Sequence, residues 1–213
     1  FFAPEGGYFM TGAIRTHRDK IWNSLFVIDG KGDPVATYDK HQLVPFGEFV
    51  PLRSVLPLDK ITPGATDFSR GEGVRTIKLA DIPPFSPLIC YEVVFPWLAA
   101  RHDVRPDWLL NVTNDAWYGD SPGPYQHFDM TRMRAIEQGL PLVRAANTGI
   151  SALIDPYGRI VGHVPLNFRG MIDRALPKAL TPTFYARFGE LPIVGLLLGA
   201  IAAYLLYRRR LKD

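Results

Sequence analysis

The sequence predicts an α/β or layered α+β domain that is followed by a single transmembrane helix. Residues 1–180 contain many short apolar runs separated by Gly, Pro and Asp, which are typical of strands interleaved with helices. An uncharged apolar segment then runs from residue 191 to residue 207. With 47% hydrophobic and 21% charged residues, the chain has the balance of a globular protein, which excludes a disordered one.

The expected elements can be given in chain order. Apolar runs predict strands at 8–14, 22–29, 34–38, 74–80, 87–90, 108–113, 141–146, 151–154 and 159–164. Helices are expected at 93–102 and at 126–138, where Phe128, Met130, Met133 and Ile136 recur at helical spacing. Hairpin turns are expected at 30–33 and 155–158. Residues 39–73 are rich in Pro and Gly and predict a long ordered loop, which in a compact domain usually serves function.

The segment 191–207 is 17 residues long. As a helix it would span about 25 Å, slightly less than a hydrocarbon core of about 30 Å, and flanking aromatic and basic residues can supply the difference. Arg208, Arg209 and Arg210 follow directly, which favours a cytoplasmic C-terminus. A buried core helix is the alternative. The expected division of the chain is 1–180 for the α/β domain, 181–190 for a linker, 191–207 for the membrane helix and 208–213 for a basic tail.

The charge and the cysteine content of the chain argue against several classes of site and partner. The chain has 24 Lys and Arg against 21 Asp and Glu, a net charge of +3, and residues 208–213 alone contain four basic side chains and one acidic one. The rest of the chain is neutral, which gives no support to a nucleic-acid partner. A single Cys excludes an internal disulfide and any multi-Cys metal site, and no two of the five His stand at i, i+4. We expect no metal and no cofactor.

Cys90 is the first candidate catalytic residue. It closes an apolar run and is followed at once by Tyr91 and Glu92. A thiol at the end of a buried strand is rigidly held, and it becomes a nucleophile where a nearby cation or base favours the thiolate. The alternative is that Cys90 is a small apolar core residue.

A second candidate lies in the segment YDKHQLVPFGEFVP, residues 38–51. Glu48 has apolar neighbours there, so burying it would be costly unless a partner fixed its charge. A carboxylate beside a lysine such as Lys40 and a thiol could perform acid–base chemistry, although spacing in the sequence alone does not bring the three together. The alternative is a surface ion pair between Lys40 and the adjacent Asp39.

Four motifs occur in order along the chain, namely YDKHQLVPFGEFVP, ICYEVVFP, NVTNDAWYGDSPGPYQH and RAIEQGLPLVRAANTGISALIDPYGRI. Together they resemble the nitrilase, or carbon–nitrogen hydrolase, superfamily. With the terminal membrane helix they resemble, within it, the bacterial apolipoprotein N-acyltransferase family. The resemblance covers nearly the whole chain, and it implies an αββα sandwich with a Glu–Lys–Cys triad.

The resemblance also implies roles for single residues. Cys90 would be the nucleophile that takes an acyl chain as a thioester, and Lys40 would stabilise the oxyanion of the tetrahedral intermediate. Glu48 matches an additional essential carboxylate of the family. Tyr91 and Glu92 match its residues that flank the cysteine.

Two further pairs are candidates for substrate binding. Phe46 and Phe49 offer apolar surface for an acyl chain, with ordinary loop packing as the alternative. Asn114 and Trp117 lie in a segment that matches a loop near the family's site, with a structural turn as the alternative. Four more residues match framework positions and are expected to be scaffolding: Arg134, Glu137, Arg144 and Asn147.

One departure from the family pattern concerns the general-base Glu of the triad. It should lie well upstream of the lysine motif, whereas Glu5 is only 35 residues before Lys40 and lacks the surrounding motif, so it is not assigned. The family's other membrane helices are also expected before this domain. We therefore expect that the chain alone is not a competent enzyme.

The function that the resemblance implies is transfer of a fatty acyl chain from a phospholipid to the N-terminal α-amine of a diacylglyceryl-cysteine apolipoprotein. Its expected place is the bacterial inner membrane, with the catalytic domain in the periplasm and the C-terminus in the cytoplasm. Two alternatives remain open. One is a membrane-tethered amidase or nitrilase in which water resolves the thioester, and the other is a non-catalytic module that keeps the fold without the upstream Glu.

Overall fold

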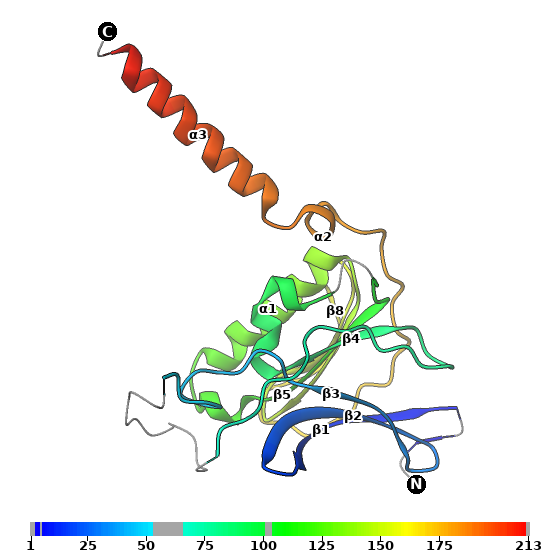
Figure 1. Cartoon of the computed structure of the whole chain (residues 1–213). Coiled ribbons are helices and arrows are strands. Elements are labelled where there is room, and N and C mark those ends of the chain that lie inside the picture. The colour runs from blue at the N-terminus through cyan, green and yellow to red at the C-terminus, as the bar shows by residue number, and fades with distance from the viewer. Residues whose placement is uncertain (1–2, 5, 53–65, 101–103, 212–213) are drawn as a thin grey trace.

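The computed structural model describes residues 3–4, 6–52, 66–100 and 104–211. Two β-sheets are stacked face to face, and the long helix α1 covers the outer face of the second sheet (Figure 1). No helix covers the outer face of the first sheet among these residues. The described part of the chain therefore shows three layers, one of helix and two of sheet.

The first sheet is an antiparallel meander in the order β1-β2-β3. Its strands are β1 (Tyr8–His17), β2 (Lys20–Asp29) and β3 (Pro34–Asp39). The expected turn at 30–33 is confirmed, since Asp29 Oδ1 accepts the backbone N–H groups of Lys31 and Asp33, both at 2.9 Å. This hairpin delivers the end of β3, and with it Lys40, to the edge where the candidate site lies.

The second sheet has the order β4-β5-β6-β7-β8. The first three strands are parallel and the last two antiparallel. Their bounds are β4 (Phe85–Ile89), β5 (Trp108–Asn114), β6 (Leu142–Asn147), β7 (Ser151–Ile154) and β8 (Ile160–Val164). Because parallel strands end at the same edge, Cys90, Asn114 and Asn147 come to one side of the sheet, where open α/β sheets usually bind their ligands.

Apolar side chains fill the space between the two sheets. Leu25, Val27 and Tyr38 of the first sheet pack in one buried cluster with residues such as Phe85 and Val112 of the second. A second cluster lies between the five-stranded sheet and α1. Both faces of the second sheet are thus buried, as its continuous apolar strands predict.

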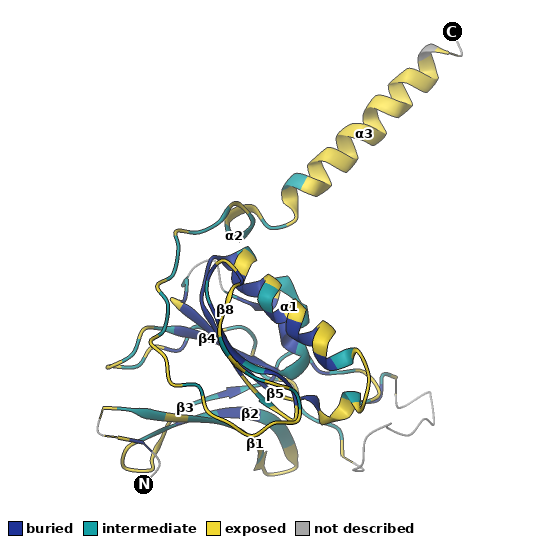
Figure 2. Ribbon diagram, turned by 180° about the vertical axis from the view of Figure 1, so that it is seen from behind, coloured by how far each residue is buried: buried dark blue, intermediate teal, exposed yellow. Residues whose placement is uncertain are grey.

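Helix α1 (Gly123–Gln138) confirms the expected helix but not the expected apolar face. Met130, Met133 and Ile136 are exposed. The side of α1 that faces the sheet is buried (Figure 2), and four of its seven buried residues are polar. The buried members of this face include His127, Phe128, Thr131, Arg134 and Gln138. Helix α1 therefore carries polar side chains on its buried face, where they contribute to a polar network at the site.

Two expected elements are wrong. Residues 74–80 form only a single bridge, between Ile77 and Phe85, and not a strand. In place of a helix at 93–102, the chain forms two short 3-10 helices, η1 (Cys90–Val94) and η2 (Pro96–Leu98), and residues 101–103 lie outside the described part. Pro96 lacks the N–H that a continuous α-helix would need, so the apolar spacing here was misleading.

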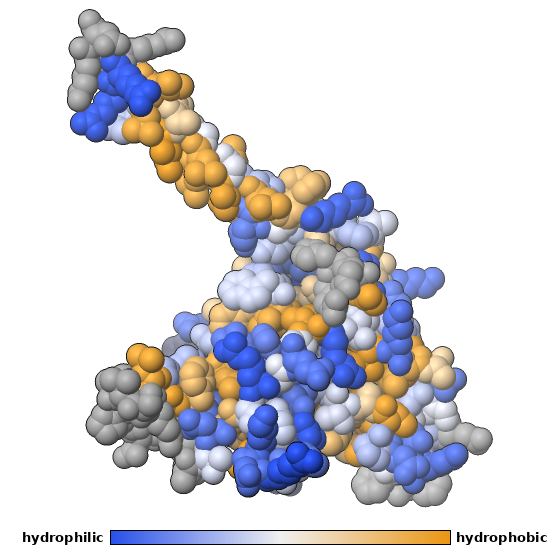
Figure 3. All heavy atoms as spheres, in the orientation of Figure 1, coloured by the Kyte–Doolittle hydropathy of each residue, from blue (hydrophilic) through white to orange (hydrophobic). Residues whose placement is uncertain are grey.

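The C-terminal part contains α2 (Phe184–Phe188) and α3 (Leu191–Arg210). Helix α3 extends away from the sheets and is apolar over most of its surface, with hydrophilic residues near its end (Figure 3). Among the described residues, the helix Leu191–Arg209 is the one that is long and apolar enough to cross a membrane, and none of it is buried. In the described structure this helix is therefore not a buried core helix.

Candidate active site

Cys90 lies at the sharp junction between β4 and η1. Its φ angle is 52°, in the left-handed region, and the residue is half-buried. For a residue with a Cβ this conformation costs of order 1–3 kcal/mol and persists only where the surrounding structure fixes it. A nucleophile on a strained turn between a strand and a helix is a recurring arrangement in hydrolases.

Glu92, which was expected only to flank Cys90, joins that junction to the end of β3. Its fully buried carboxylate accepts four hydrogen bonds at 2.8–3.0 Å. The donors are the Tyr38 hydroxyl and the backbone N–H groups of His41, Gln42 and Ile89. Burial raises the pKa of Glu92, while these backbone donors and the positive charge of Lys40 oppose the rise.

We expect Glu92→Gln to destabilise the protein by about 2–4 kcal/mol, because the amide would direct its NH₂ group at the Ile89 N–H and leave buried donors unpaired. The measurement is thermal unfolding of the purified protein, followed by tryptophan fluorescence. Glu72→Gln changes an exposed carboxylate in the same way and is the matched control. Equal melting temperatures for the two variants would contradict the role assigned to Glu92.

Lys40 and Glu48 form a direct ion pair, with 2.7 Å between Lys40 Nζ and Glu48 Oε2. The Lys40 side chain is 1% exposed, so the pair is not a surface contact. Asp39 is engaged elsewhere, since it pairs with Arg15 at 2.6 Å and accepts the Ser24 hydroxyl at 2.6 Å. The alternative of a Lys40–Asp39 surface pair is therefore wrong.

Two further contacts fix the Glu48 carboxylate. The Val44 N–H donates to its Oε2 at 2.9 Å, and the Asn23 side chain donates to Oε1 at 3.2 Å. The backbone carbonyl of Asn23 also accepts the backbone N–H of Lys40 at 2.8 Å. Glu48 is thus held by its own loop and by β2, and it orients the lysine ammonium.

The candidate substrate-binding residues lie in two separate segments of the chain. Phe46 has a φ of 61° and is 37% exposed, and Phe49 is half-buried and accepts the Phe46 N–H at 2.7 Å. Trp117 is 65% exposed in the short helix η3 (Asp115–Tyr118). Asn114 caps η3, because its Oδ1 accepts the Ala116 N–H at 3.2 Å. The turn-forming role of Asn114 is therefore present in the structure, and Trp117 has an exposed ring beside it.

Behind Cys90 lies a buried polar network that the sequence did not identify. Asp115 Oδ2 pairs with Arg144 at 2.6 Å, and Asp115 Oδ1 lies 3.0 Å from His127 Nδ1. On its other side, His127 Nε2 is 3.2 Å from the carbonyl oxygen of Cys90. Burial alone would raise the pKa of Asp115, but the His127 hydrogen bond and the Arg144 charge outweigh it and lower the pKa.

Arg144 is the centre of this network and confirms the scaffolding expected of it. The guanidinium is fully buried and donates to Asn111, to Thr131 at 3.1 Å and to the Ile150 carbonyl at 3.1 Å. Polar residues at i and i+4 on α1, namely His127 and Thr131, were the signal in the sequence that could have revealed the network.

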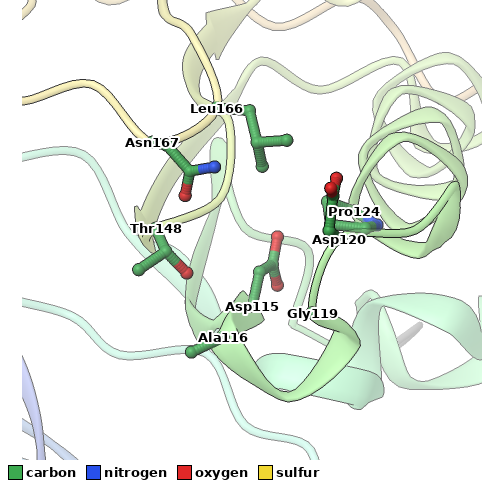
Figure 4. Close-up of a pocket in the computed structure, with 8 residues that line it drawn as sticks. All are labelled: Asp115, Ala116, Gly119, Asp120, Pro124, Thr148, Leu166 and Asn167. Carbon is green, nitrogen blue, oxygen red and sulfur yellow. The ribbon is translucent and has the colours of Figure 1, made fainter.

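A pocket of about 210 Å³ opens beside Asp115 (Figure 4). It is lined by Asp115, Ala116, Gly119, Asp120, Pro124, Thr148, Leu166 and Asn167. Cys90, Lys40 and Glu48 are not among the lining residues. The pocket therefore neighbours the buried network and does not by itself define a substrate site.

The structure thus brings some of the candidate site residues into contact and leaves others apart. Lys40 and Glu48 are in contact, and Glu92 connects their loop to the Cys90 junction. Tyr91 packs edge-on against Phe95, with ring centroids 5.4 Å apart. Glu5 lies outside the described residues, and no group of three or more His, Cys, Asp or Glu suitable for a metal occurs among the residues that are described.

Comparison with known protein families identifies the class of protein to which these stacked sheets and this site belong. The model of the carbon–nitrogen hydrolase family matches residues 5–183, and the chain belongs to this family. Curated relatives within it carry the name of an enzyme, apolipoprotein N-acyltransferase. The relative from Rhodopseudomonas palustris is 46% identical and that from Bradyrhizobium diazoefficiens 45%, each over 97% of this chain and 40% of its own length. The chain thus spans about two fifths of these relatives.

Solved structures share the fold. An amidase from Nesterenkonia sp. is 20% identical, with a TM-score of 0.59 over 90% of this chain and 67% of its own. A CN-hydrolase superfamily protein from Xanthomonas campestris is also 20% identical, with a TM-score of 0.56 over 75% of this chain and 58% of its own. The expected nitrilase-like fold is confirmed.

Proposed function

We propose that the chain is the catalytic part of an apolipoprotein N-acyltransferase, which moves a fatty acyl chain from a phospholipid to the N-terminal α-amine of a diacylglyceryl-cysteine apolipoprotein. The observation that carries the proposal is the buried Lys40–Glu48 pair, which Glu92 ties to the Cys90 junction. Support for the substrates comes from the names of the relatives and from the apolar helix α3.

The reaction has two half-reactions that share one intermediate. In the first, the Cys90 sulfur attacks the ester carbonyl carbon of the phospholipid, the carbon–oxygen bond breaks, and a lysophospholipid leaves with the proton. In the second, the acceptor amine attacks the thioester, the carbon–sulfur bond breaks and the thiol is restored. The base that moves these protons is the Glu expected upstream of the lysine motif.

Lys40 acts on the charge that develops on the carbonyl oxygen. An ammonium in a buried site is worth far more to an oxyanion than it would be in water. Its pairing with Glu48 keeps it in place before substrate arrives, so little reorganisation is needed in the transition state. Phe46, Phe49 and Trp117 are the side chains proposed to contact acyl chains, because they are apolar and partly exposed on loops at this edge.

The substrate test is direct. The full-length protein in phospholipid vesicles should transfer a radiolabelled acyl chain to a synthetic diacylglyceryl-cysteine peptide with a free α-amine. The same peptide with an acetylated amine is the control, because it has no nucleophile to resolve the thioester. Turnover of small amides without any lipid would instead favour a membrane-tethered amidase, which the fold shared with the Nesterenkonia amidase makes the second candidate.

The proposed topology places residues 1–180 outside the cytoplasm, 181–190 as the linker, 191–207 in the inner membrane and 208–213 inside. In the full-length protein without other reactive cysteines, Lys212→Cys in a Cys90→Ala background should stay unlabelled by an impermeant maleimide in intact spheroplasts. Lys178→Cys is the control on the other side of the membrane and should be labelled. Labelling at position 212 without lysis would reverse the proposed orientation.

A further inference from the structure

The strained backbone of Cys90 is held by hydrogen bonds on both sides. Before it, the Ile89 N–H donates to Glu92 Oε2 at 2.8 Å. At Cys90 itself, the carbonyl oxygen lies 3.2 Å from His127 Nε2. Glu92 belongs to the same short segment as Cys90, whereas His127 comes from α1, 37 positions further along the chain. A left-handed residue with a Cβ needs such external support to persist.

The ring of His127 is fixed by its neighbours. The side chain is 1% exposed. Its Nδ1 lies 3.0 Å from Asp115 Oδ1 and 3.1 Å from Arg144 Nη2. Asp115 and Arg144 also pair with each other at 2.6 Å, so the group behind the ring is rigid and buried.

These neighbours decide which ring nitrogen carries a proton. If only Nδ1 were protonated, the bare Nε2 lone pair would face the lone pairs of the Cys90 carbonyl, which is unfavourable. In the neutral form with the proton on Nε2, Nδ1 can accept from Arg144 Nη2, although its lone pair then also faces Asp115 Oδ1. In the imidazolium form, Nδ1–H donates to Asp115, which is the hydrogen bond that helps to lower the pKa of Asp115. Each of these two forms keeps a proton on Nε2, which His127 donates to the Cys90 carbonyl.

We propose that His127 is a positioning residue, which holds the Cys90 carbonyl through Nε2–H and thereby keeps the thiol in its reactive conformation. This inference rests on the proposed role of Cys90 as nucleophile. Because the Nε2 proton is directed at a backbone oxygen, His127 is not the base that takes the thiol proton. The role of His127 thus differs from that of the His in cysteine enzymes where the His accepts the thiol proton.

The test compares two substitutions in the full-length protein. His127→Gln keeps an N–H donor at about the position of Nε2, whereas His127→Leu removes it and keeps much of the bulk. Single-turnover formation of the acyl-enzyme from phospholipid should slow by at least about 30-fold in His127→Leu and by less than about fivefold in His127→Gln. The change should fall on the rate constant and not on the lipid concentration at half-saturation. The exposed His163→Leu is the matched control.

A second readout needs no lipid substrate. The rate of alkylation of Cys90 by iodoacetamide is followed against pH by mass spectrometry of its peptide. The ionisable groups that face the His127 ring are Asp115 and Tyr118 from η3 and Arg144 from β6. These groups are unchanged in His127→Gln and the Nε2–H donor is kept, so the limiting rate of alkylation should stay close to that of the native protein. In His127→Leu the limiting rate should fall at least about fivefold.

Each outcome has a consequence. A native rate of acyl-enzyme formation in His127→Leu would overturn the proposal, and so would equal losses in the Leu and Gln variants, since packing alone would then explain them. A limiting alkylation rate in His127→Leu equal to that of the native protein would also overturn it. If the native protein forms no acyl-enzyme, the proposed function fails, while the alkylation rates still decide the positioning role.

Discussion

Replacing Cys90 with Ala in the full-length protein is expected to abolish acyl transfer, with a loss of at least about 10⁴-fold, while the protein remains folded and in the membrane. Replacing the half-buried CH₂–SH side chain by a methyl group opens no large cavity and leaves no buried polar group unpaired. The free energy of unfolding should therefore change little. The reaction, in contrast, cannot proceed, because the Cys90 sulfur that carries the acyl chain is gone. Transfer of labelled acyl chains to the acceptor peptide is the measurement.

The control for this loss is Cys90→Ser, which keeps the hydrogen-bonding character of the side chain and its size. A serine hydroxyl is a much weaker nucleophile than a thiolate, so we expect acyl transfer by Cys90→Ser to be nearly as poor as that by Cys90→Ala. Matching melting temperatures for both variants and the native protein would show that the loss is chemical. Near-native transfer by Cys90→Ala would contradict the whole mechanism.

Lys40→Ala is expected to reduce the rate of thioester formation by about 10²–10³-fold, the usual cost of removing one donor to an oxyanion. The loss should fall on the rate constant far more than on lipid binding, because the ammonium acts on charge that appears only in the transition state. Stopped single-turnover reactions with phospholipid, in which the acyl-enzyme is quantified over time, measure this directly.

The neighbouring substitutions separate charge from geometry. Lys40→Arg should not restore the rate, because the planar guanidinium is larger than the ammonium and presents its charge in a different place. Glu48→Gln should retain more activity than Glu48→Ala, since an amide can still accept from Val44 and orient the lysine. A native rate of thioester formation in Lys40→Ala would show that the Lys40–Glu48 pair is merely structural.

The layered fold could be predicted from the sequence because most of its strands carry clear local signals. The hairpins at 30–33 and 155–158 have turn residues between apolar runs, and the structure contains both. The failure at 93–102 has a physical cause, since apolar spacing alone does not reveal that Pro96 divides the segment into short 3-10 turns. For 74–80, a β-like pattern was not matched by a partner strand along its length.

Part of the candidate site could also be predicted. Motif order pointed to Cys90, Lys40 and Glu48, and a buried glutamate among apolar residues implied a cationic partner, which the structure supplies as Lys40. The four donors to Glu92 could not be foreseen, because three of them are backbone N–H groups, and two of these, from His41 and Gln42, come from a segment 50 or more residues away in the chain. The contacts of His127 could not be predicted from the sequence for a similar reason. Its partners, Asp115, Arg144 and the Cys90 carbonyl, meet only after the sheet and α1 have assembled.

The most direct test of the central claim is the mass of the full-length enzyme after brief incubation with a phospholipid of defined acyl composition and no acceptor. We predict an increase equal to one acyl group, located on the peptide that contains Cys90. This acyl group should be released by neutral hydroxylamine, as a thioester is, and should be lost when the diacylglyceryl-cysteine peptide is added. An acyl group on another residue, or an enzyme that transfers acyl chains without ever gaining that mass, would contradict the account.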